Sequence, residues 1–253
     1  MALRQPAAPL PRGLDLGVLA LVGALVLWWR WNGWLDPYVD FGREVYVPWR
    51  LADGAVLYRD IAYHAGPLSP YVNAVMFSLF GATLTTLIWT NIALAAGMAA
   101  ALYVVMDRIA GRLTAFLGGL TFILLFMAAQ YNYRGNFNWI APYSHEMTHG
   151  LLLSLVSILL MHRAAPDEQR PWHTLLAGAA TGLVFLTKPE IFAAVLAANV
   201  TVLLVWCHGL WRASDRRAYA RVLGLNAGLW AGGGLGVTAL AVGIVQEVAF
   251  QSG

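Results

Sequence analysis

Residues 14–30 read LDLGVLALVGALVLWWR, an apolar run that ends in two tryptophans and an arginine. Runs of about 20 residues can cross the hydrocarbon core of a bilayer as α-helices, because a helix satisfies its own backbone hydrogen bonds in lipid. The chain is 59% hydrophobic and 11% charged, whereas soluble domains carry about 25% charged residues. We therefore expect an all-α, polytopic transmembrane bundle of about seven or eight helices. Further apolar runs cover residues 83–106, 113–129, 147–161, 172–187, 191–211 and 222–248.

The basic residues predict how the chain is oriented. They gather in the N-terminal tail (residues 1–13) and in the connections at residues 107–112, 162–170 and 212–221, and such basic segments stay on the cytoplasmic side. Residues 31–67 and 130–146 then form two outer loops, and we expect short interfacial helices in the first. This requires that the short run at residues 68–80 does not cross, so we expect a re-entrant or interfacial helix there. The net charge of +3 belongs to the cytoplasmic segments, and we expect no nucleic-acid partner.

Carboxylates are concentrated in the first outer loop. A membrane protein that gathers acids at one face usually handles a charged ligand, a metal or a proton there. Asp40 and Glu44 are four residues apart and would share one face of a helix, where carboxylates can bind a divalent cation or act as a general base. The alternative is a solvated amphipathic helix on the membrane, its acids paired with Arg43 and Arg50. The acids of this loop are Asp36, Asp40, Glu44, Asp53 and Asp60.

Two further polar groups are candidates for ligand binding. Arg59 can clamp an anion, and His64 can bind a metal or contact a phosphate. Lys188 and Glu190 join two apolar runs, where charges are costly unless they are used or paired. Lys188 therefore suits a lipid phosphate, and the alternative is a snorkelling Lys188–Glu190 pair at the interface.

Residues 145–149 read HEMTH and match the H-E-x-x-H pattern of zinc proteases. On a helix His145 and His149 would face one way, and Glu146 could activate a zinc-bound water. The only candidate for a third ligand is Glu190. The alternative is that these residues, with Tyr143, line a cavity and contact a head group.

A glycine-rich stretch at residues 232–236 reads GGGLG. It lies inside an apolar run and lacks the strand–loop–helix context of a phosphate-binding loop. We expect it to allow close packing between two helices.

The order of several short motifs resembles a known family. They are a glycine that ends a helix (Gly54), a Tyr-x-Asp (Tyr58, Asp60), a Gly-Pro-Leu (residues 66–68), a Leu-Phe-Gly (residues 79–81) and a Leu-Thr-Lys-Pro (residues 186–189). Over residues 14–190 their order and spacing resemble the N-terminal half of the GT-C superfamily membrane glycosyltransferases. The resemblance is to the branch of protein O-mannosyltransferases and lipid A aminoarabinose transferases, which is glycosyltransferase family 39-like.

The resemblance implies transfer of a sugar from a polyprenyl-phosphate-linked donor to a glycan, lipid or protein acceptor. It implies an integral protein of a bacterial inner (plasma) membrane, with a cytoplasmic N-terminus and an extracytoplasmic active site. Asp40 is the implied catalytic base, and Asp40 and His64 are the implied ligands of a divalent ion, Mg or Mn. The family's acid and Lys before Pro-Pro-Leu are here His64 and Ala65. The candidate substrate-binding residues are Glu44, Arg43, Arg59, Asp60, Tyr143, His145, Glu146, Lys188 and Glu190.

Residues 1–253 then form a single transmembrane GT-C-like domain, which we expect to be incomplete at its C-terminus because members of that family are usually longer. Two alternatives remain open. One is an intramembrane zinc metalloprotease built on His145, Glu146 and His149, and Zn is expected only in that case. The other is a non-catalytic component that binds or transports a lipid-linked sugar. In all three cases membrane lipids surround the protein.

Overall fold

A computed structural model describes residues 12–31, 33, 41–128, 138–164, 171–209, 213 and 215–251. In these residues the chain forms nine α-helices and a short π-helical segment, and it forms no β-strand. The predicted all-α bundle is thereby confirmed, and the helix count is higher than expected because α2 and α3 are short additional helices. The elements are α1 (Arg12–Trp29), α2 (Phe41–Ala52), α3 (Leu68–Phe80), α4 (Leu84–Ala110), α5 (Arg112–Thr121), η1 (Phe122–Met127), α6 (His145–Arg163), α7 (Pro171–Phe185), α8 (Pro189–Gly209) and α9 (Arg216–Gln251).

The surface of the bundle is that of a membrane protein. Among the described residues, three helical segments are long and apolar enough to cross a bilayer: Leu84–Ala110, Pro189–Gly209 and Arg216–Ile244. Only 6% of the last segment's apolar window is buried inside the protein, and large side chains such as Leu235 and Leu240 are mostly exposed. Apolar surface of this extent is stable only when hydrocarbon or another apolar partner covers it.

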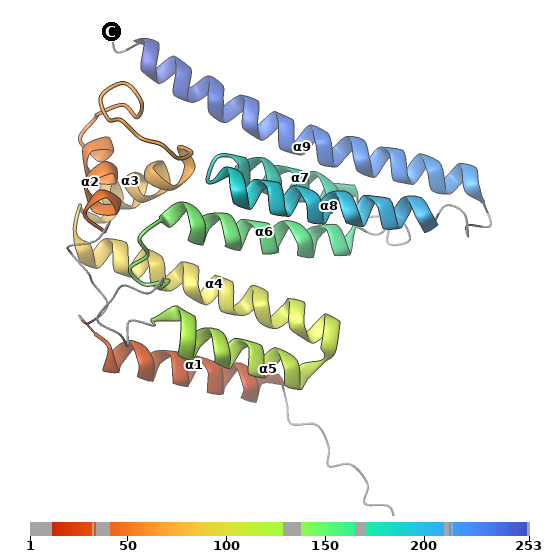
Figure 1. Ribbon diagram of the computed structural model, residues 1–253, viewed down its shortest axis with the longest axis horizontal. Coiled ribbons are helices and arrows are strands. Elements are labelled where there is room, and N and C mark those ends of the chain that lie inside the picture. The colour runs from red at the N-terminus through yellow and green to blue at the C-terminus, as the bar shows by residue number, and fades with distance from the viewer. Residues whose placement is uncertain are drawn as a thin grey trace, which may run out of the picture.

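The long helices run side by side, and α2 and α3 lie together at one end of them (Figure 1). Helix α3 has 13 residues, and α4 starts beside it at this same end. Residues 68–80 therefore do not cross the bundle, as the charge pattern predicted. We call this end, which carries α2, α3, the first turn of α6 and the α7–α8 corner, the loop end.

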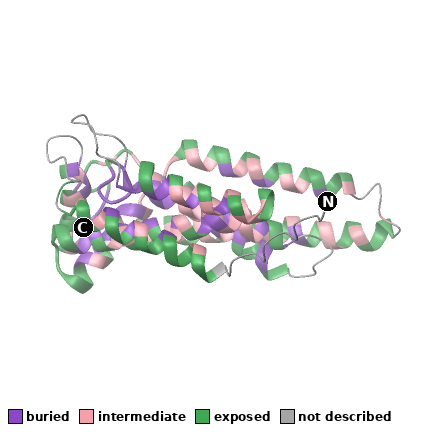
Figure 2. Ribbon diagram, turned by 90° about the horizontal axis from the view of Figure 1, so that it is seen from below, coloured by how far each residue is buried: buried purple, intermediate pink, exposed green. Residues whose placement is uncertain are grey.

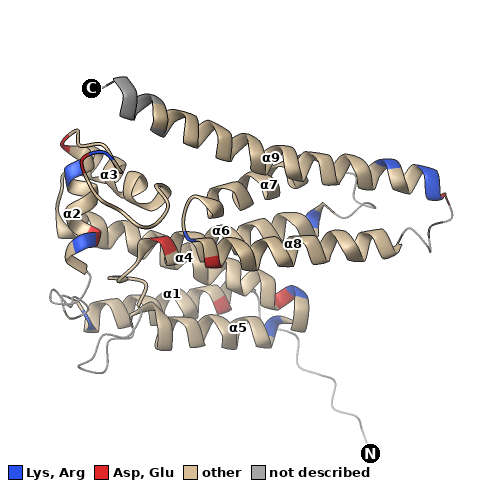
Figure 3. Cartoon of the chain, turned by 45° about the horizontal axis from the view of Figure 1, so that its top comes forward, with Lys and Arg blue, Asp and Glu red and all other residues tan. Residues whose placement is uncertain are grey.

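Among the described residues the charged ones lie toward the two ends of the bundle, and the middle of the long helices is almost free of them (Figure 3). The end opposite the loop end carries a partly buried ion pair. Arg112 Nε and Nη2 lie 2.5 and 2.8 Å from the Asp15 carboxylate, and the Tyr103 hydroxyl donates to the same group at 3.1 Å. This cluster ties the first turn of α1 to α4 and α5.

Helices α7 and α9 pack backbone against backbone. A side chain at Gly178 would collide with the carbonyl of Trp230, and one at Gly182 would collide with Gly234. On α9, Gly233 lies equally close to the carbonyl of Leu175. Small residues at four-residue spacing allow such approach in membranes, so the glycine-rich stretch has the packing role that its context predicted.

Buried residues lie along the inside of the bundle and at the loop end, while outward helix faces are exposed (Figure 2). Some of the buried groups are polar. Asn199 on α8 donates to Ser157 at 2.8 Å and to Thr181 at 2.9 Å, which connects α6, α7 and α8. Hydrogen bonds between membrane helices of this kind fix which faces meet.

Candidate functional site

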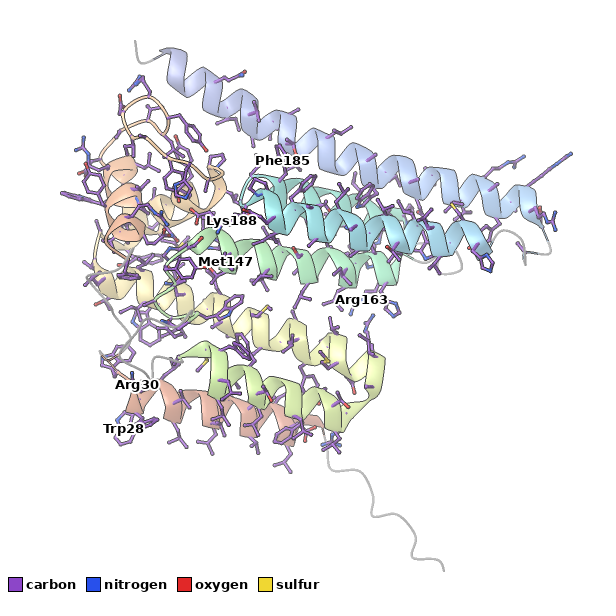
Figure 4. The ribbon with its side chains drawn as sticks, in the orientation of Figure 1. Trp28, Arg30, Met147, Arg163, Phe185 and Lys188 are labelled. Atoms are coloured by element: carbon purple, nitrogen blue, oxygen red, sulfur yellow. The ribbon has the colours of Figure 1, made fainter. Side chains whose placement is uncertain are left out.

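The loop end of the bundle gathers most of the polar residues that the sequence singled out. Figure 4 labels Lys188 and Met147 at this end and Arg163 at the opposite one. Helix α2 is amphipathic: it buries Phe41, Glu44, Val47 and Leu51 along one face, and its aromatic Tyr46 is exposed. Glu44 is on the buried face with only 4% exposure, so this carboxylate is not the solvated group that the amphipathic-helix alternative predicted.

The loop after α2 holds its own charged pair. Gly54 follows α2 with a φ of +94°, a conformation that glycine adopts without strain. Arg59 donates to Asp60 at 2.8 and 2.9 Å, and the backbone N–H of Val56 donates to Asp60 at 2.8 Å. The hydrogen bond from Arg59 lowers the pKa of Asp60 to about 2. Arg59 and Asp60 therefore stabilise this exposed turn.

The end of the loop is bonded to the α7–α8 corner. The N–H of Gly66 donates to the carbonyl of Thr187 at 2.8 Å, and the N–H of Leu68 donates to that of Leu186 at 3.0 Å. A Cβ at residue 66 would overlap the carbonyl of Leu186, so only glycine fits there. The Gly-Pro-Leu and Leu-Thr-Lys-Pro motifs are thus in direct contact, and Lys188 directly follows the two residues of the second motif whose carbonyls accept these bonds.

Glu44 connects α2 to the first turn of α6. Its Oε2 accepts the backbone N–H of His145 at 3.0 Å and lies 2.5 Å from His145 Nδ1. Its Oε1 accepts Arg43 Nε and Nη2 at 3.1 and 2.9 Å, and Arg43 also donates to the carbonyl of Tyr143 at 3.1 Å. Burial raises the pKa of the Glu44 carboxyl, but the hydrogen bonds from His145 and Arg43 outweigh it, and the pKa lies below its usual value of 4.5.

The other ring nitrogen of His145 is also occupied. Asn91 Nδ2, on α4, lies 3.1 Å from His145 Nε2 and donates to the carbonyl of Ile140 at 3.0 Å. Both Asn91 and His145 are almost fully buried. Sequence reasoning missed Asn91, although an isolated amide within an apolar run is itself a signal, because such groups are costly in a membrane unless they are bonded.

The remaining two residues of the H-E-x-x-H match face separate partners. Glu146 accepts the Tyr63 hydroxyl and, at 2.6 Å, that of Ser144. His149 Nδ1 lies 2.8 Å from the Ser69 hydroxyl on α3, and its Nε2 makes no hydrogen bond to the described residues. Glu190, the candidate third ligand, is exposed in the first turn of α8. In the described part of the chain no three His, Cys, Asp or Glu side chains are placed to hold a metal.

The structure thus separates the sequence candidates into groups. It brings together Arg43, Glu44, Tyr143, His145 and Glu146 at the α2–α6 contact. Arg59 and Asp60 bond to each other, and no ion pair among the described residues joins Lys188 to Glu190. Asp40 lies outside the described residues and directly precedes α2 in the sequence.

Two cavities meet beside the α7–α8 corner. The first encloses about 360 Å³ and is lined by the loop residues Tyr58, His64 and Gly66, by Thr187 and Pro189 on either side of Lys188, and by Gln246 of α9. The second encloses about 370 Å³ between α7, α8 and α9, and its lining is almost entirely apolar. Phe185 lines both, so the first cavity, which we call the mouth, lies next to the second, which we call the apolar groove. Partial burial raises the pKa of Tyr58 to about 12, and its hydroxyl donates to the carbonyl of Ala65 at 2.6 Å.

Comparison with known proteins identifies a family for the region that contains these motifs and part of the lining of both cavities. The family model described as dolichyl-phosphate-mannose-protein mannosyltransferase matches residues 64–229. The matched region begins at His64, includes the Gly-Pro-Leu and Leu-Thr-Lys-Pro motifs, and extends into α9. Searches of curated proteins and of solved structures gave no match. Because the model covers more than half of the chain, this integral membrane protein belongs to the dolichyl-phosphate-mannose-protein mannosyltransferase family, a glycosyltransferase family of the GT-C type.

Proposed function

We propose that the chain transfers a sugar from a polyprenyl-phosphate-linked donor to an acceptor outside the cytoplasm. The observation that carries this proposal is the pair of adjoining cavities. A prenyl chain requires an apolar groove that opens near groups able to hold its head group, and the groove between α7, α8 and α9 adjoins the mouth, where His64 and Gln246 are among the lining residues. Family membership supports the general class of donor.

A cation beside the mouth, Lys188, is suited to a phosphate leaving group. Lys188 lies between two residues that line the mouth and is partly exposed. A cation there stabilises the negative charge that develops on the phosphate as the bond to the sugar breaks. His64 is exposed on the same cavity and offers a further hydrogen bond to the phosphate or to the sugar.

In the proposed reaction an acceptor hydroxyl or amine attacks the anomeric carbon of the sugar. The new bond to that carbon forms while its bond to the phosphate oxygen breaks, and the polyprenyl phosphate leaves. The acceptor's proton passes to a carboxylate that acts as general base, a role we assign to Asp40 from the resemblance. The acceptor is a glycan, a lipid or a protein.

A divalent ion at Asp40 and His64 stays a prediction. Two described acids of the first outer loop are already bonded: Glu44 to Arg43 and His145, and Asp60 to Arg59. No group of three metal-binding side chains is present among the described residues, and Asp40 lies outside them, so the proposed reaction uses only the groups of the chain.

The proposed setting is a bacterial inner membrane, with the N-terminus in the cytoplasm and the loop end outside. The clustering of Arg108, Arg112, Arg216 and Arg217 at the opposite end supports this orientation (Figure 3). We further propose that residues 1–253 form one domain of the GT-C type, with residues 31–67 and 130–146 as outer loops.

The experiment compares wild-type protein with Asp40→Asn and with Asp53→Asn, a matched control in the same loop whose side chain is exposed. Each purified protein is incubated in lipid nanodiscs with a radiolabelled polyprenyl-phosphate sugar, and both lipid binding and sugar transfer are measured. We expect Asp40→Asn to bind the lipid without transferring the sugar, and Asp53→Asn to do both. Full transfer by Asp40→Asn would refute its role as base. Binding without transfer by the wild type would favour the non-catalytic component.

A further inference from the structure

The contact between α2 and α6 contains a hydrogen-bond chain whose donors and acceptors can be assigned. The first assignment is at Glu44. An ionised carboxylate only accepts hydrogen bonds, and Glu44 Oε2 lies 2.5 Å from His145 Nδ1. The hydrogen in that contact therefore belongs to Nδ1.

The second assignment is at Asn91. Its Nδ2 donates to the carbonyl of Ile140 at 3.0 Å, and a carbonyl can only accept. This identifies the amide nitrogen of Asn91, which also lies 3.1 Å from His145 Nε2. An amide nitrogen offers only hydrogens, so Nε2 must accept. The contacts of His145 therefore place a hydrogen on Nδ1 and leave Nε2 to accept from Asn91.

The chain of bonds also replaces the usual cap of a helix. Ser144 occupies the N-cap position of α6, but its side chain makes no capping bond and donates to Glu146 instead. The backbone N–H of His145 is accepted by Glu44, from a different helix. Glu44 thus holds the first turn of α2 against the first turn of α6, and Asn91 fixes both to α4. The other titratable or charged groups around this contact are Arg43 on α2, Tyr63 in the loop, Glu146 and His149 on α6, and Lys188 at the α7–α8 corner.

We infer that Asn91, His145 and Glu44 form a positioning relay that holds the start of α2 in place. Helix α2 begins at Phe41, the residue after Asp40, so the relay sets where the proposed base is presented to the acceptor. This consequence rests on the proposed function. Misplacing a catalytic group by about 1 Å costs roughly 100-fold in rate, which is the loss expected in kcat when the relay is broken. The KM for the donor stays unchanged, because the cavities are lined by other residues.

His145→Gln and His145→Leu separate a positioning role from proton transfer. A glutamine amide can donate to Glu44 and accept from Asn91, as the imidazole does, but it cannot gain or lose a proton. We expect His145→Gln to keep kcat within about 10-fold of wild type with the same pH profile, and His145→Leu and Asn91→Leu to lose roughly 100-fold. Equal losses in His145→Gln and His145→Leu would overturn the relay.

A second readout does not depend on activity. Full-length protein is treated with diethylpyrocarbonate, which modifies an accessible, unbonded imidazole nitrogen, and each histidine is quantified by mass spectrometry. Exposed His64 is the internal standard, and His145 should react at least about 10-fold more slowly, because its nitrogens are released only by local opening. Asn91→Leu should speed the reaction of His145, and Asp15→Asn, which disturbs a polar contact at the opposite end, should not.

The kinetics and the rate at which diethylpyrocarbonate modifies His145 together test the relay separately from the proposed sugar transfer. Reaction of wild-type His145 as fast as His64 overturns the relay, whether or not the protein transfers sugar. Slow reaction of His145 together with full activity of Asp40→Asn supports the relay as a structural connection and overturns the role of Asp40.

Discussion

Replacing Gly66 by alanine tests the contact that joins the first outer loop to the α7–α8 corner. The added Cβ would overlap the carbonyl carbon and oxygen of Leu186 and crowd the nitrogen of Thr187. These are backbone atoms at a helix corner, so they cannot move aside as a flexible side chain would. The loop must separate from the corner, and the two hydrogen bonds from Gly66 and Leu68 are lost.

The size of the effect follows from these bonds. Each backbone hydrogen bond contributes about 1 kcal/mol net, and a buried carbonyl left unpaired costs about 1–3 kcal/mol. We therefore expect Gly66→Ala to lower the free energy of unfolding by roughly 2–4 kcal/mol. The φ of Gly66 is not in the left-handed region, so backbone strain adds nothing to this value.

The assay is thermal unfolding of the purified protein in detergent, followed by tryptophan fluorescence, with Gly42→Ala as the matched control. Gly42 is in α2, and a Cβ there meets nothing within 4 Å. Since alanine favours a helix over glycine by about 1 kcal/mol, the control should be as stable as wild type or slightly more so. If Gly66→Ala unfolds at the same temperature as Gly42→Ala, the contact between the two motifs is not as described.

Three further outcomes follow from the geometry. Arg112→Gln leaves the Asp15 carboxylate without its cation, so the unfolding temperature should fall while the KM for the donor stays unchanged, because the pair lies at the end of the bundle opposite the cavities. Leu196→Trp fills the apolar groove, so the KM for the donor should rise while kcat is kept, and Leu204→Trp on the outer face of the same helix should change neither. The lowered pKa of Glu44 means that its ionised form stabilises the fold above the usual carboxyl range, and this contribution is lost as the pH falls through the lowered pKa. Unfolding temperatures measured from neutral to acidic pH should show a smaller acid-induced fall in Glu44→Gln than in the wild type.

Hydropathy located the helices but not their ends. The run at residues 172–187 was expected to be helical throughout, yet α7 ends at Phe185. Leu186 and Thr187 leave the helix because their carbonyls accept the N–H groups of Leu68 and Gly66, which is a tertiary contact. At α9 the helix begins at Arg216, before the apolar run at residues 222–248, because Asp215 caps it: the Asp215 carboxylate accepts the backbone N–H groups of Arg217 and Ala218 at 3.0 Å.

The site was predicted as a set of charged residues, and the structure adds the neutral ones that hold them. Glu44 and His145 were singled out by type and spacing, but Asn91, Ser69 and Tyr63 were not, because each is an uncharged residue that matches no motif. Their partners are on other helices. A pattern within one segment cannot show a bond between segments, although the cost of burying an amide indicates that a partner exists.

The match of residues 145–149 to a zinc-protease pattern has a structural explanation in the start of α6. The first turn of a helix leaves backbone N–H groups unpaired and favours negative charge, and here Glu44 from α2 and Glu146 from α6 itself lie at that turn. His145 and His149 are one turn apart, so both face the neighbouring helices, where Asn91 and Ser69 bond to them. A zinc ion on His145 would have to displace Glu44 or Asn91, and would break the contact that fixes α2. The five residues that resemble a metal site in sequence are therefore better explained by the start of α6, where the backbone N–H groups and the two histidines need hydrogen-bond partners from neighbouring elements.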